Sequence, residues 1–252
     1  MFTSPGAIAF TIFGIDIRWY GILVAGGILT ACFLAYFRAP KYKIDQEHLL
    51  DVLLWSVPFG IIGARAYYVI FNWANYAGDI KHILNFREGG LAIHGGLILG
   101  ILTAFFVCRY HKMLLRDVLD LLAPSIALGQ AIGRWGNFFN SEAHGGPTDL
   151  PWAVIVNGQG VHPTFLYESI WCLLLCIFLL IVSRNIKFPG QIICLYAVLY
   201  SVERFFVEAL RTDSLMIGPF KQAQVLSLTV IICGIILYKV LSKTAASKKS
   251  RK

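Results

Sequence analysis

Charged side chains are scarce in this chain of 252 residues. Asp, Glu, Lys and Arg together make up 14% of it, whereas apolar residues make up 57%. The mean hydropathy is positive. A soluble globular protein of this length needs a more polar surface. The composition therefore excludes a soluble fold and predicts a membrane protein with several spans.

Disulfide and metal-ligand patterns are lacking as well. The six cysteines fall within or at the ends of apolar segments, and Cys172 and Cys176 are four residues apart, where a disulfide would be strained. Neither a disulfide framework nor a zinc spacing is present. No basic residue precedes Arg18, so we expect no cleavable signal peptide. We also expect no metal and no cofactor.

Seven apolar segments are long enough to cross a bilayer as helices. A crossing takes about 20 residues. Glycines weaken the third segment, and two aspartates begin the fourth. The predicted fold is all-α, a single integral-membrane domain over residues 1–252 with about seven transmembrane helices. These candidate spans are residues 19–37, 49–71, 91–108, 117–135, 164–183, 190–210 and 223–241.

Basic residues predict the orientation of the chain in the membrane. They gather in the turns after the first, third and fifth spans and in the tail 242–252, whereas the loop 138–163 has none. The positive-inside rule then places the N-terminus outside and the C-terminus in the cytoplasm. The net charge of +8 is explained by topology, so we expect no nucleic-acid partner. We expect residues 1–17 at the outer interface, and residues 72–90 and 136–163 as external loops.

Polar residues gather on the predicted outer half of the spans. The most conspicuous stretch, residues 131–146, breaks a long apolar segment with an arginine, asparagines, a glutamate and several glycines. A charge at the edge of a span is costly unless it has a partner or a task. Other spans contribute polar groups to the same side. The whole set comprises Tyr20, Arg65, His94, Arg134, Asn137, Glu142, His162, Glu168, Arg204, Glu208 and Arg211.

Several of these residues also have an ordinary structural explanation. Tyr20 could anchor the chain at the interface, and Arg65 could form an ion pair with an acidic residue of another span. His94 could be a packing residue. Arg204, Glu208 and Arg211 are spaced i, i+4 and i+7, so they could neutralise one another along one helix face. Their common side nevertheless favours one site, and several arginines near lipid headgroups favour a phosphate. The expected substrate is an anionic phospholipid.

Four motifs carry a family resemblance. The segment GRWGNFFNSEAHG at 133–145, HGG at 94–96, HPTFLYE at 162–168 and RFFVEALRTD at 204–213 resemble those of bacterial phosphatidylglycerol–prolipoprotein diacylglyceryl transferases. The motifs occur in the family's order, and the resemblance covers nearly the whole chain. Thr212 departs from the family, which commonly has proline at that position.

The resemblance implies a reaction and its partners. Family members move the diacylglyceryl group of phosphatidylglycerol onto the thiol of the lipobox cysteine in a prolipoprotein signal peptide, and glycerol 1-phosphate leaves. The resemblance implies a multi-pass protein of the bacterial cytoplasmic membrane, surrounded by membrane lipids, with its site toward the outer leaflet. Because the leaving phosphate gains charge, arginines that bind it more strongly in the transition state would speed the reaction.

Roles for individual residues follow as hypotheses. Arg134 and Arg204 are expected to bind and stabilise the phosphate, and His94 to take the thiol proton. Whether His94 or the bound phosphate is the base stays open, as do the roles of Arg65 and Arg211. Glu208 is expected to pair with Arg204. The predicted substrate-binding residues are Tyr20, Arg65, Asn137, Glu142, Gly145, Glu208 and Arg211.

Two other functions compete with this one. A lipid transporter or flippase would have polar groups that continue to the inner leaflet, or broken helices at the midplane. The second alternative is a different lipid enzyme, for example an acyl or phosphatidyl transferase; acyl transfer would need an activated serine or cysteine beside a base, and none stands out. A metal-dependent phosphotransferase would need clustered aspartates, but Asp117 and Asp120 are isolated and lie on the predicted inner side.

Overall fold

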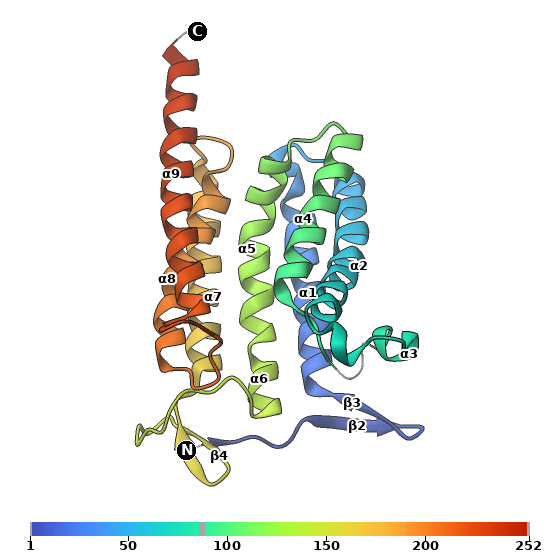
Figure 1. The fold of residues 1–252 in the computed structure, drawn as a ribbon. Coiled ribbons are helices and arrows are strands. Elements are labelled where there is room, and N and C mark those ends of the chain that lie inside the picture. The colour runs from blue at the N-terminus through green and yellow to red at the C-terminus, as the bar shows by residue number, and fades with distance from the viewer. Residues whose placement is uncertain (1, 86–88, 251–252) are drawn as a thin grey trace. The chain divides into compact units, whose positions relative to one another are not determined.

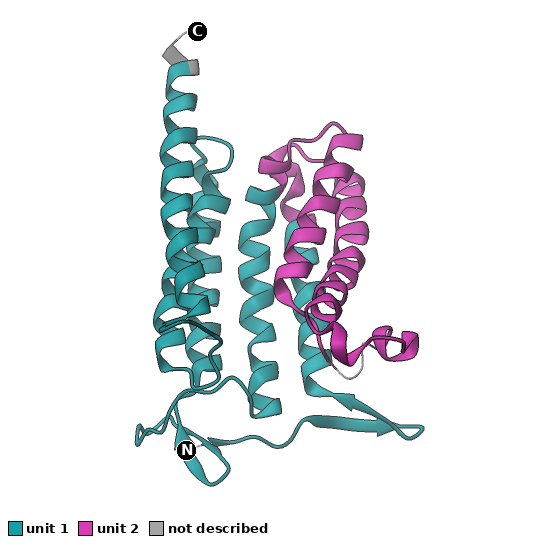
Figure 2. Ribbon diagram, in the orientation of Figure 1, with its two compact units in different colours: residues 1–35, 119–252 teal, residues 36–118 magenta. Residues whose placement is uncertain are grey.

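The computed structural model describes residues 2–85 and 89–250, so residues 86–88 of the predicted external loop 72–90 and the end of the predicted tail lie outside the described residues. The described chain is mainly helical and divides into two compact units, residues 1–35 with 119–252 and residues 36–118 (Figures 1 and 2). The prediction of a mainly helical fold is therefore confirmed.

Unit 1 contains the first helix and the C-terminal half of the chain. Its helices are α1 (Trp19–Arg38, whose last turn enters unit 2), α5 (Leu115–Gly133, whose first turn belongs to unit 2), α6 (Trp135–Asn140), α7 (Thr164–Val182), α8 (Gln191–Leu210) and α9 (Gln222–Ser250). Small residues allow α1 and α5 to approach closely, because a Cβ on Gly27 would lie 2.8 Å from the carbonyl oxygen of Gly129. A buried cluster joins α5, α7 and α8 through Ala123, Ala127, Leu175, Cys176, Leu179 and Ile192.

Side chains from other elements hold both ends of α8. The buried carboxylate of Asp120, on α5, accepts hydrogen bonds from the backbone N–H groups of Gly190 (2.7 Å) and Ile193 (2.8 Å) at the start of α8. A carboxylate is favourable there because helix N-termini carry unpaired N–H groups and a partial positive charge. At the other end, the Lys221 ammonium donates to the carbonyl oxygens of Glu208 and Arg211, each at 2.7 Å. The backbone of α8 is thus fixed at both ends.

Short strands flank the helices, which the all-α prediction missed. Strands β2 (Ile8–Ile12) and β3 (Ile15–Arg18) form an antiparallel hairpin within the predicted interfacial segment 1–17. Its turn, Phe13-Gly14, has positive φ at both residues, as a type I′ hairpin turn requires. The predicted loop 136–163 contains α6, β4 (Val154–Val156) and β5 (Gln159–Val161), and β4 also pairs with β1 (Phe2–Thr3). Two further short strands, β6 (Met216–Ile217) and β7 (Phe220–Lys221), pair with each other.

Unit 2 is built around the antiparallel helices α2 (Gln46–Phe71) and α4 (Ile93–Tyr110), with the short elements η1 (Ala39–Tyr42), η2 (Trp73–Asn75) and α3 (Ile80–Ile83). Asp45 caps α2 by accepting from the N–H groups of Glu47 (2.8 Å) and His48 (3.2 Å). The helices touch at Gly63 and Gly95, where neither position has room for a Cβ. Glycine is therefore required at this crossing.

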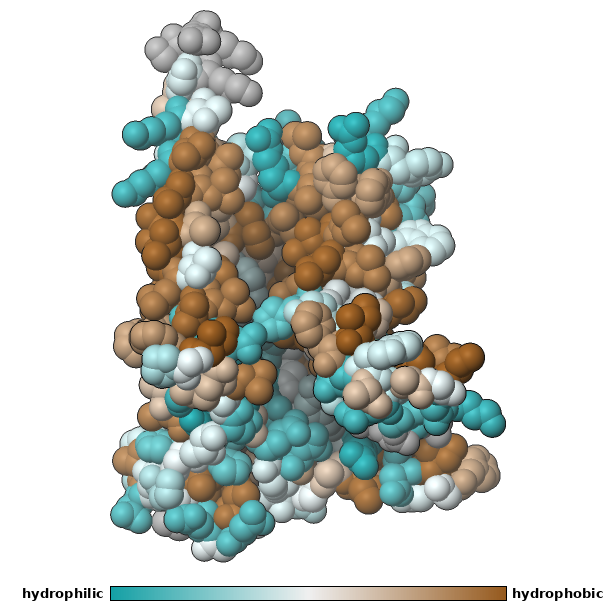
Figure 3. All heavy atoms as spheres, in the orientation of Figure 1, coloured by the Kyte–Doolittle hydropathy of each residue, from teal (hydrophilic) through white to brown (hydrophobic). Residues whose placement is uncertain are grey.

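Five helices in the described residues are long and apolar enough to cross a membrane: Trp19–Tyr42, Gln46–Phe71, Ile93–Tyr110, Thr164–Asn185 and Gln222–Ser247. They correspond to the predicted spans one, two, three, five and seven. Every stretch of 18 residues within α5 or α8 contains three charged residues, whereas each of the other five helices has such a stretch with two or fewer. In the space-filling view, hydrophobic side chains cover the middle of α9, and hydrophilic side chains lie toward the helix ends (Figure 3). The fourth and sixth crossings, which would be made by α5 and α8, and the orientation of the termini stay predictions.

Candidate active site

A buried glutamate of unit 1 joins two arginines. Glu168 Oε2 lies 3.0 Å from Arg134 Nη1, and Arg204 Nη1 donates to Glu168 Oε1 at 2.9 Å. Arg204 Nη2 also lies 2.6 Å from Glu208 Oε2, one helical turn along α8. We call these four residues the arginine–glutamate cluster. The predicted pairing of Glu208 with Arg204 is confirmed, and the two arginines predicted to act together do lie together.

The cluster draws its members from three elements. Arg134 stands at the junction of α5 and α6, Glu168 in the second turn of α7, and Arg204 and Glu208 near the end of α8. The Glu168 side chain is 1% exposed, whereas each arginine side chain is 20% exposed. The carboxylate is therefore buried, whereas the two arginine side chains keep some exposure. A guanidinium has five N–H donors, so donors remain for an anionic ligand.

Further hydrogen bonds hold Arg134 in place. Its Nη2 donates to the Tyr200 hydroxyl at 3.0 Å. The next residue, Trp135, donates from its indole nitrogen to the Ser169 hydroxyl at 3.1 Å, and Ser169 donates in turn to the carbonyl oxygen of Ala131 at 2.8 Å. These bonds tie the α5–α6 junction to α7. The guanidinium of Arg134 is thus positioned from both its own backbone and α8.

Asn137 and Glu142 close the loop after α6. Glu142 Oε1 accepts from Asn137 Nδ2 (3.0 Å) and Asn140 Nδ2 (3.2 Å), and the Glu142 N–H donates to the Asn137 carbonyl (3.1 Å). The chain turns through positive φ at Ser141 and Ala143. The spacing of three residues between Arg134 and Asn137 is thus not matched by a common partner: the Asn137 amide binds Glu142.

Gly145 and Tyr20 make close approaches in the same unit. The Gly145 N–H donates to the carbonyl of His162 (2.9 Å), and a Cβ at Gly145 would lie 2.6 Å from His162 Cβ. The Tyr20 ring packs on Gly136, where a Cβ would lie 2.7 Å from Tyr20 Cδ2. Tyr20 is 41% exposed. Neither glycine has room for a Cβ, and the Tyr20 ring contacts the residue of α6 that directly precedes Asn137.

The expected stripe of Arg204, Glu208 and Arg211 is wrong in its last member. Helix α8 ends at Leu210, and Arg211 has an extended backbone (ψ 143°), so the i+7 spacing no longer places it on the same face. Arg211 instead forms a two-pronged ion pair with Asp213, with Nε–Oδ1 at 2.9 Å and Nη2–Oδ2 at 2.7 Å. These hydrogen bonds from Arg211 hold the pKa of the Asp213 carboxyl below its ordinary value.

The other two predicted site residues lie in unit 2. Arg65 is 3% exposed and donates to the carbonyl oxygens of His82 (2.7 Å), Ile83 (2.9 Å) and Gly89 (2.8 Å). The structural alternative for Arg65 was an ion pair with an acidic residue of another span. The hydrogen bonds above run instead to backbone carbonyls of the segment after α2. His94 lies in the first turn of α4, half-buried, with its ring centroid 6.1 Å from that of Tyr67. The remaining eight predicted residues belong to unit 1.

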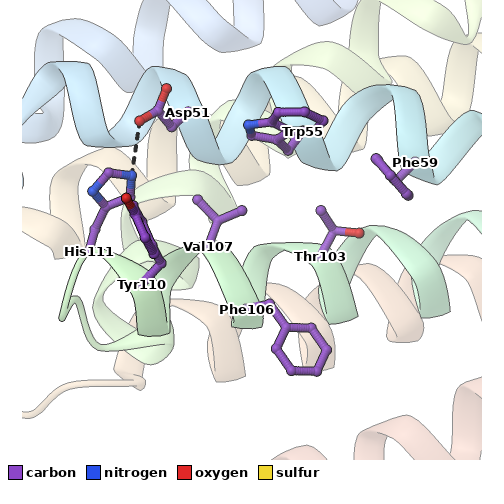
Figure 4. A pocket seen from close by; sticks show the side chains of 8 residues that line it. All are labelled: Asp51, Trp55, Phe59, Thr103, Phe106, Val107, Tyr110 and His111. Carbon is purple, nitrogen blue, oxygen red and sulfur yellow. Dashed lines mark ion pairs between the residues drawn. The ribbon is translucent and has the colours of Figure 1, made fainter.

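A groove of about 430 Å³ also lies in unit 2, between α2 and α4 (Figure 4). It is at the end of these helices away from Arg65 and His94, and none of its residues was predicted to belong to the site. Its one ion pair in the close-up joins His111 Nε2 to Asp51 Oδ2 at 2.9 Å. Its other lining residues are Trp55, Phe59, Thr103, Phe106, Val107 and Tyr110.

Sequence reasoning did not assign a site role to several residues of the cluster's surroundings. Glu168 was noticed only as one polar group among many, and Tyr200, Glu203 and Lys221 were not singled out. One signal was available. Tyr196, Tyr200, Arg204 and Glu208 follow one another at intervals of four, which places them along one face of α8. No comparable spacing predicts that Glu168, on another helix, joins the two arginines.

Comparisons with known proteins agree with these features. The family model described as prolipoprotein diacylglyceryl transferase matches residues 7–240. The chain is 51% identical to the phosphatidylglycerol–prolipoprotein diacylglyceryl transferase of Clostridioides difficile, over 94% of this chain and 95% of the relative. It is 49% identical to that of Finegoldia magna (91% and 93%) and 43% identical to that of Gloeobacter violaceus (99% and 97%). The chain therefore belongs to the prolipoprotein diacylglyceryl transferase family.

Proposed function

We propose that this protein transfers the diacylglyceryl group of phosphatidylglycerol to the thiol of the lipobox cysteine of a prolipoprotein, the first step of lipoprotein maturation. It is a membrane transferase by family, and its relatives are named for these two substrates. The observation that carries the chemical proposal is the arginine–glutamate cluster. Two partly exposed arginine side chains, held by one buried carboxylate, suit a phosphate group.

In the proposed reaction the cysteine sulfur attacks a glycerol carbon of the lipid. A carbon–sulfur bond forms and the carbon–oxygen bond to phosphate breaks, with its electron pair going to the phosphate oxygen. The phosphate changes from a diester to a monoester and gains negative charge. Arg134 and Arg204 would stabilise that charge, and this contribution grows toward the transition state. Glu168 would keep the two guanidinium groups at a fixed separation.

The thiol must also lose its proton, because the thiolate is the nucleophile. We assign this step to His94, because a neutral imidazole nitrogen can accept a proton. Tyr20, Asn137, Glu142 and Gly145 would shape the space around the headgroup. Arg65, Glu208 and Arg211 would support the site, Glu208 by fixing Arg204. We further propose that the site faces the outer leaflet of the cytoplasmic membrane, where a secreted signal peptide presents its cysteine.

The test is release of glycerol phosphate by purified protein supplied with phosphatidylglycerol and a lipobox peptide. We expect release with the cysteine peptide, none with a peptide that carries serine instead, and a loss of at least about a hundredfold in Arg134→Ala. Arg184→Ala is the matched control, because Arg184 is an exposed arginine at the far end of α7. Equal release of glycerol phosphate with the serine peptide, or release at the wild-type rate by Arg134→Ala, would refute the proposal.

A further inference from the structure

Glu203 of α8 is a buried carboxylate without a hydrogen-bond partner among the described residues. The residue is 5% exposed, and both of its carboxylate oxygens lack a donor. Glu168 and Glu208 each also have one oxygen without a geometrically ideal hydrogen bond, but those oxygens form ion pairs at 3.0 Å and 2.6 Å. Glu203 forms no such pair in the part of the chain that the structure describes. Its environment therefore does not compensate a full negative charge.

Its neighbours are the groups proposed to bind the lipid phosphate. Glu203 interacts electrostatically with Arg134, Arg204 and Glu168, and also with the thiol of Cys172. These charged and titratable groups, which act on it electrostatically, come from the α5–α6 junction, from α7 and from α8 itself. Glu203 directly precedes Arg204 in the chain. The charge on Glu203 therefore changes the electrostatic potential at both arginines.

The charges of the cluster are already balanced without Glu203. Two guanidinium groups face two paired carboxylates, Glu168 and Glu208. An ionised Glu203 would add an unpaired negative charge to a buried site, and a group in this position avoids that cost by binding a proton. A phosphodiester at the arginines would bring one more negative charge. The phosphodiester and an ionised Glu203 therefore compete for the same positive potential.

We propose that Glu203 is a proton-linked carboxylate of the headgroup site: it carries a proton while an anionic phosphodiester is bound at Arg134 and Arg204, and its ionisation weakens that binding. The proton comes from solvent, and no covalent bond changes. This inference rests on the proposed role of the two arginines. It assigns to Glu203 a regulatory effect on lipid affinity, exerted through its charge on the arginines.

The experiment measures binding of a short-chain phosphatidylglycerol to purified protein between about pH 6 and 9. A phosphodiester keeps a single charge over this range, so the ligand itself does not titrate. As the pH rises over this range, we expect the affinity of the wild type for the lipid to fall about tenfold more than that of Glu203→Gln, which removes the charge and keeps the shape. Calorimetry in buffers of different ionisation enthalpy should show proton uptake on binding in the wild type and a smaller uptake in Glu203→Gln.

Controls distinguish a failure of the role proposed for Glu203 from a failure of the phosphate site proposed at Arg134 and Arg204. Asp149→Asn removes an exposed carboxylate of the loop 136–163 and should follow the wild type. Glu203→Met, an apolar substitution of similar length, should behave like Glu203→Gln and guards against a poorly folded amide variant. If the wild type binds no lipid at any pH, the proposed phosphate site fails. If it binds, and Glu203→Gln and Glu203→Met keep the wild-type pH dependence and proton uptake, the role of Glu203 is wrong.

Discussion

At the scale of single residues, Glu168 determines how the site is built. One carboxylate binds two arginines from different elements, and its side chain is 1% exposed. Two like charges held close together need such a counter-charge, especially where water is scarce. The arginines can then present their free donors to a ligand with little rearrangement. This arrangement explains how two cations can share a small site before any phosphate arrives.

Glu168→Gln should therefore destabilise the protein as well as slow the reaction. The glutamine keeps the shape but leaves the two guanidinium groups without their common counter-charge. Breaking a buried ion pair by removing one partner costs about 3 kcal/mol. We expect a lower thermal unfolding temperature and reduced glycerol phosphate release, whereas the exposed control Asp149→Asn should change neither. Unfolding at the wild-type temperature would show that the arginines do not depend on Glu168.

At the scale of elements, α8 is the helix that organises the site. It carries Tyr200, Arg204 and Glu208 on one face, and other elements hold both of its ends. Asp120 binds N–H groups at its start, and Lys221 binds carbonyl groups at its end. Asp120, which has too few acidic neighbours in the sequence for a metal site, therefore has a structural role as the cap of α8.

Lys221→Met should loosen the end of α8 without removing any member of the arginine–glutamate cluster. The ammonium of Lys221 is the donor to carbonyls of Glu208, Ala209 and Arg211, and a cation is favourable at a helix C-terminus. We expect a loss of about 1–2 kcal/mol in unfolding free energy. Faster amide hydrogen exchange near residue 210 would locate the effect, and the exposed Lys239→Met serves as control. Unchanged exchange there would mean that Lys221 does not cap α8.

The elements also show what a sequence can and cannot predict. The long apolar helices α2, α4, α7 and α9 follow from composition alone, and the Arg204–Glu208 pair follows from i, i+4 spacing. The hairpin in residues 8–18 was missed because an apolar strand pair and an interfacial segment have similar compositions. Arg211 was misplaced because nothing local marks the end of α8 at Leu210. The contact of Glu168 with two other elements depends on tertiary packing, which no local pattern encodes.

At the scale of the whole molecule, the chain is a membrane transferase of known family with two structural units. Unit 1 carries the arginine–glutamate cluster, and unit 2 carries His94 and Arg65. The proposed mechanism assigns phosphate binding to the first and thiol activation to the second.

The measurement that tests the central claim most directly is the turnover of Arg134→Lys with phosphatidylglycerol and a lipobox peptide. Lysine keeps the positive charge but lacks the planar fork that contacts Glu168 and Tyr200 and would bind a phosphate through two donors. We predict a fall in kcat of about a hundredfold, with folding retained. Turnover at the wild-type rate would contradict the claim that the guanidinium of Arg134 stabilises the departing phosphate.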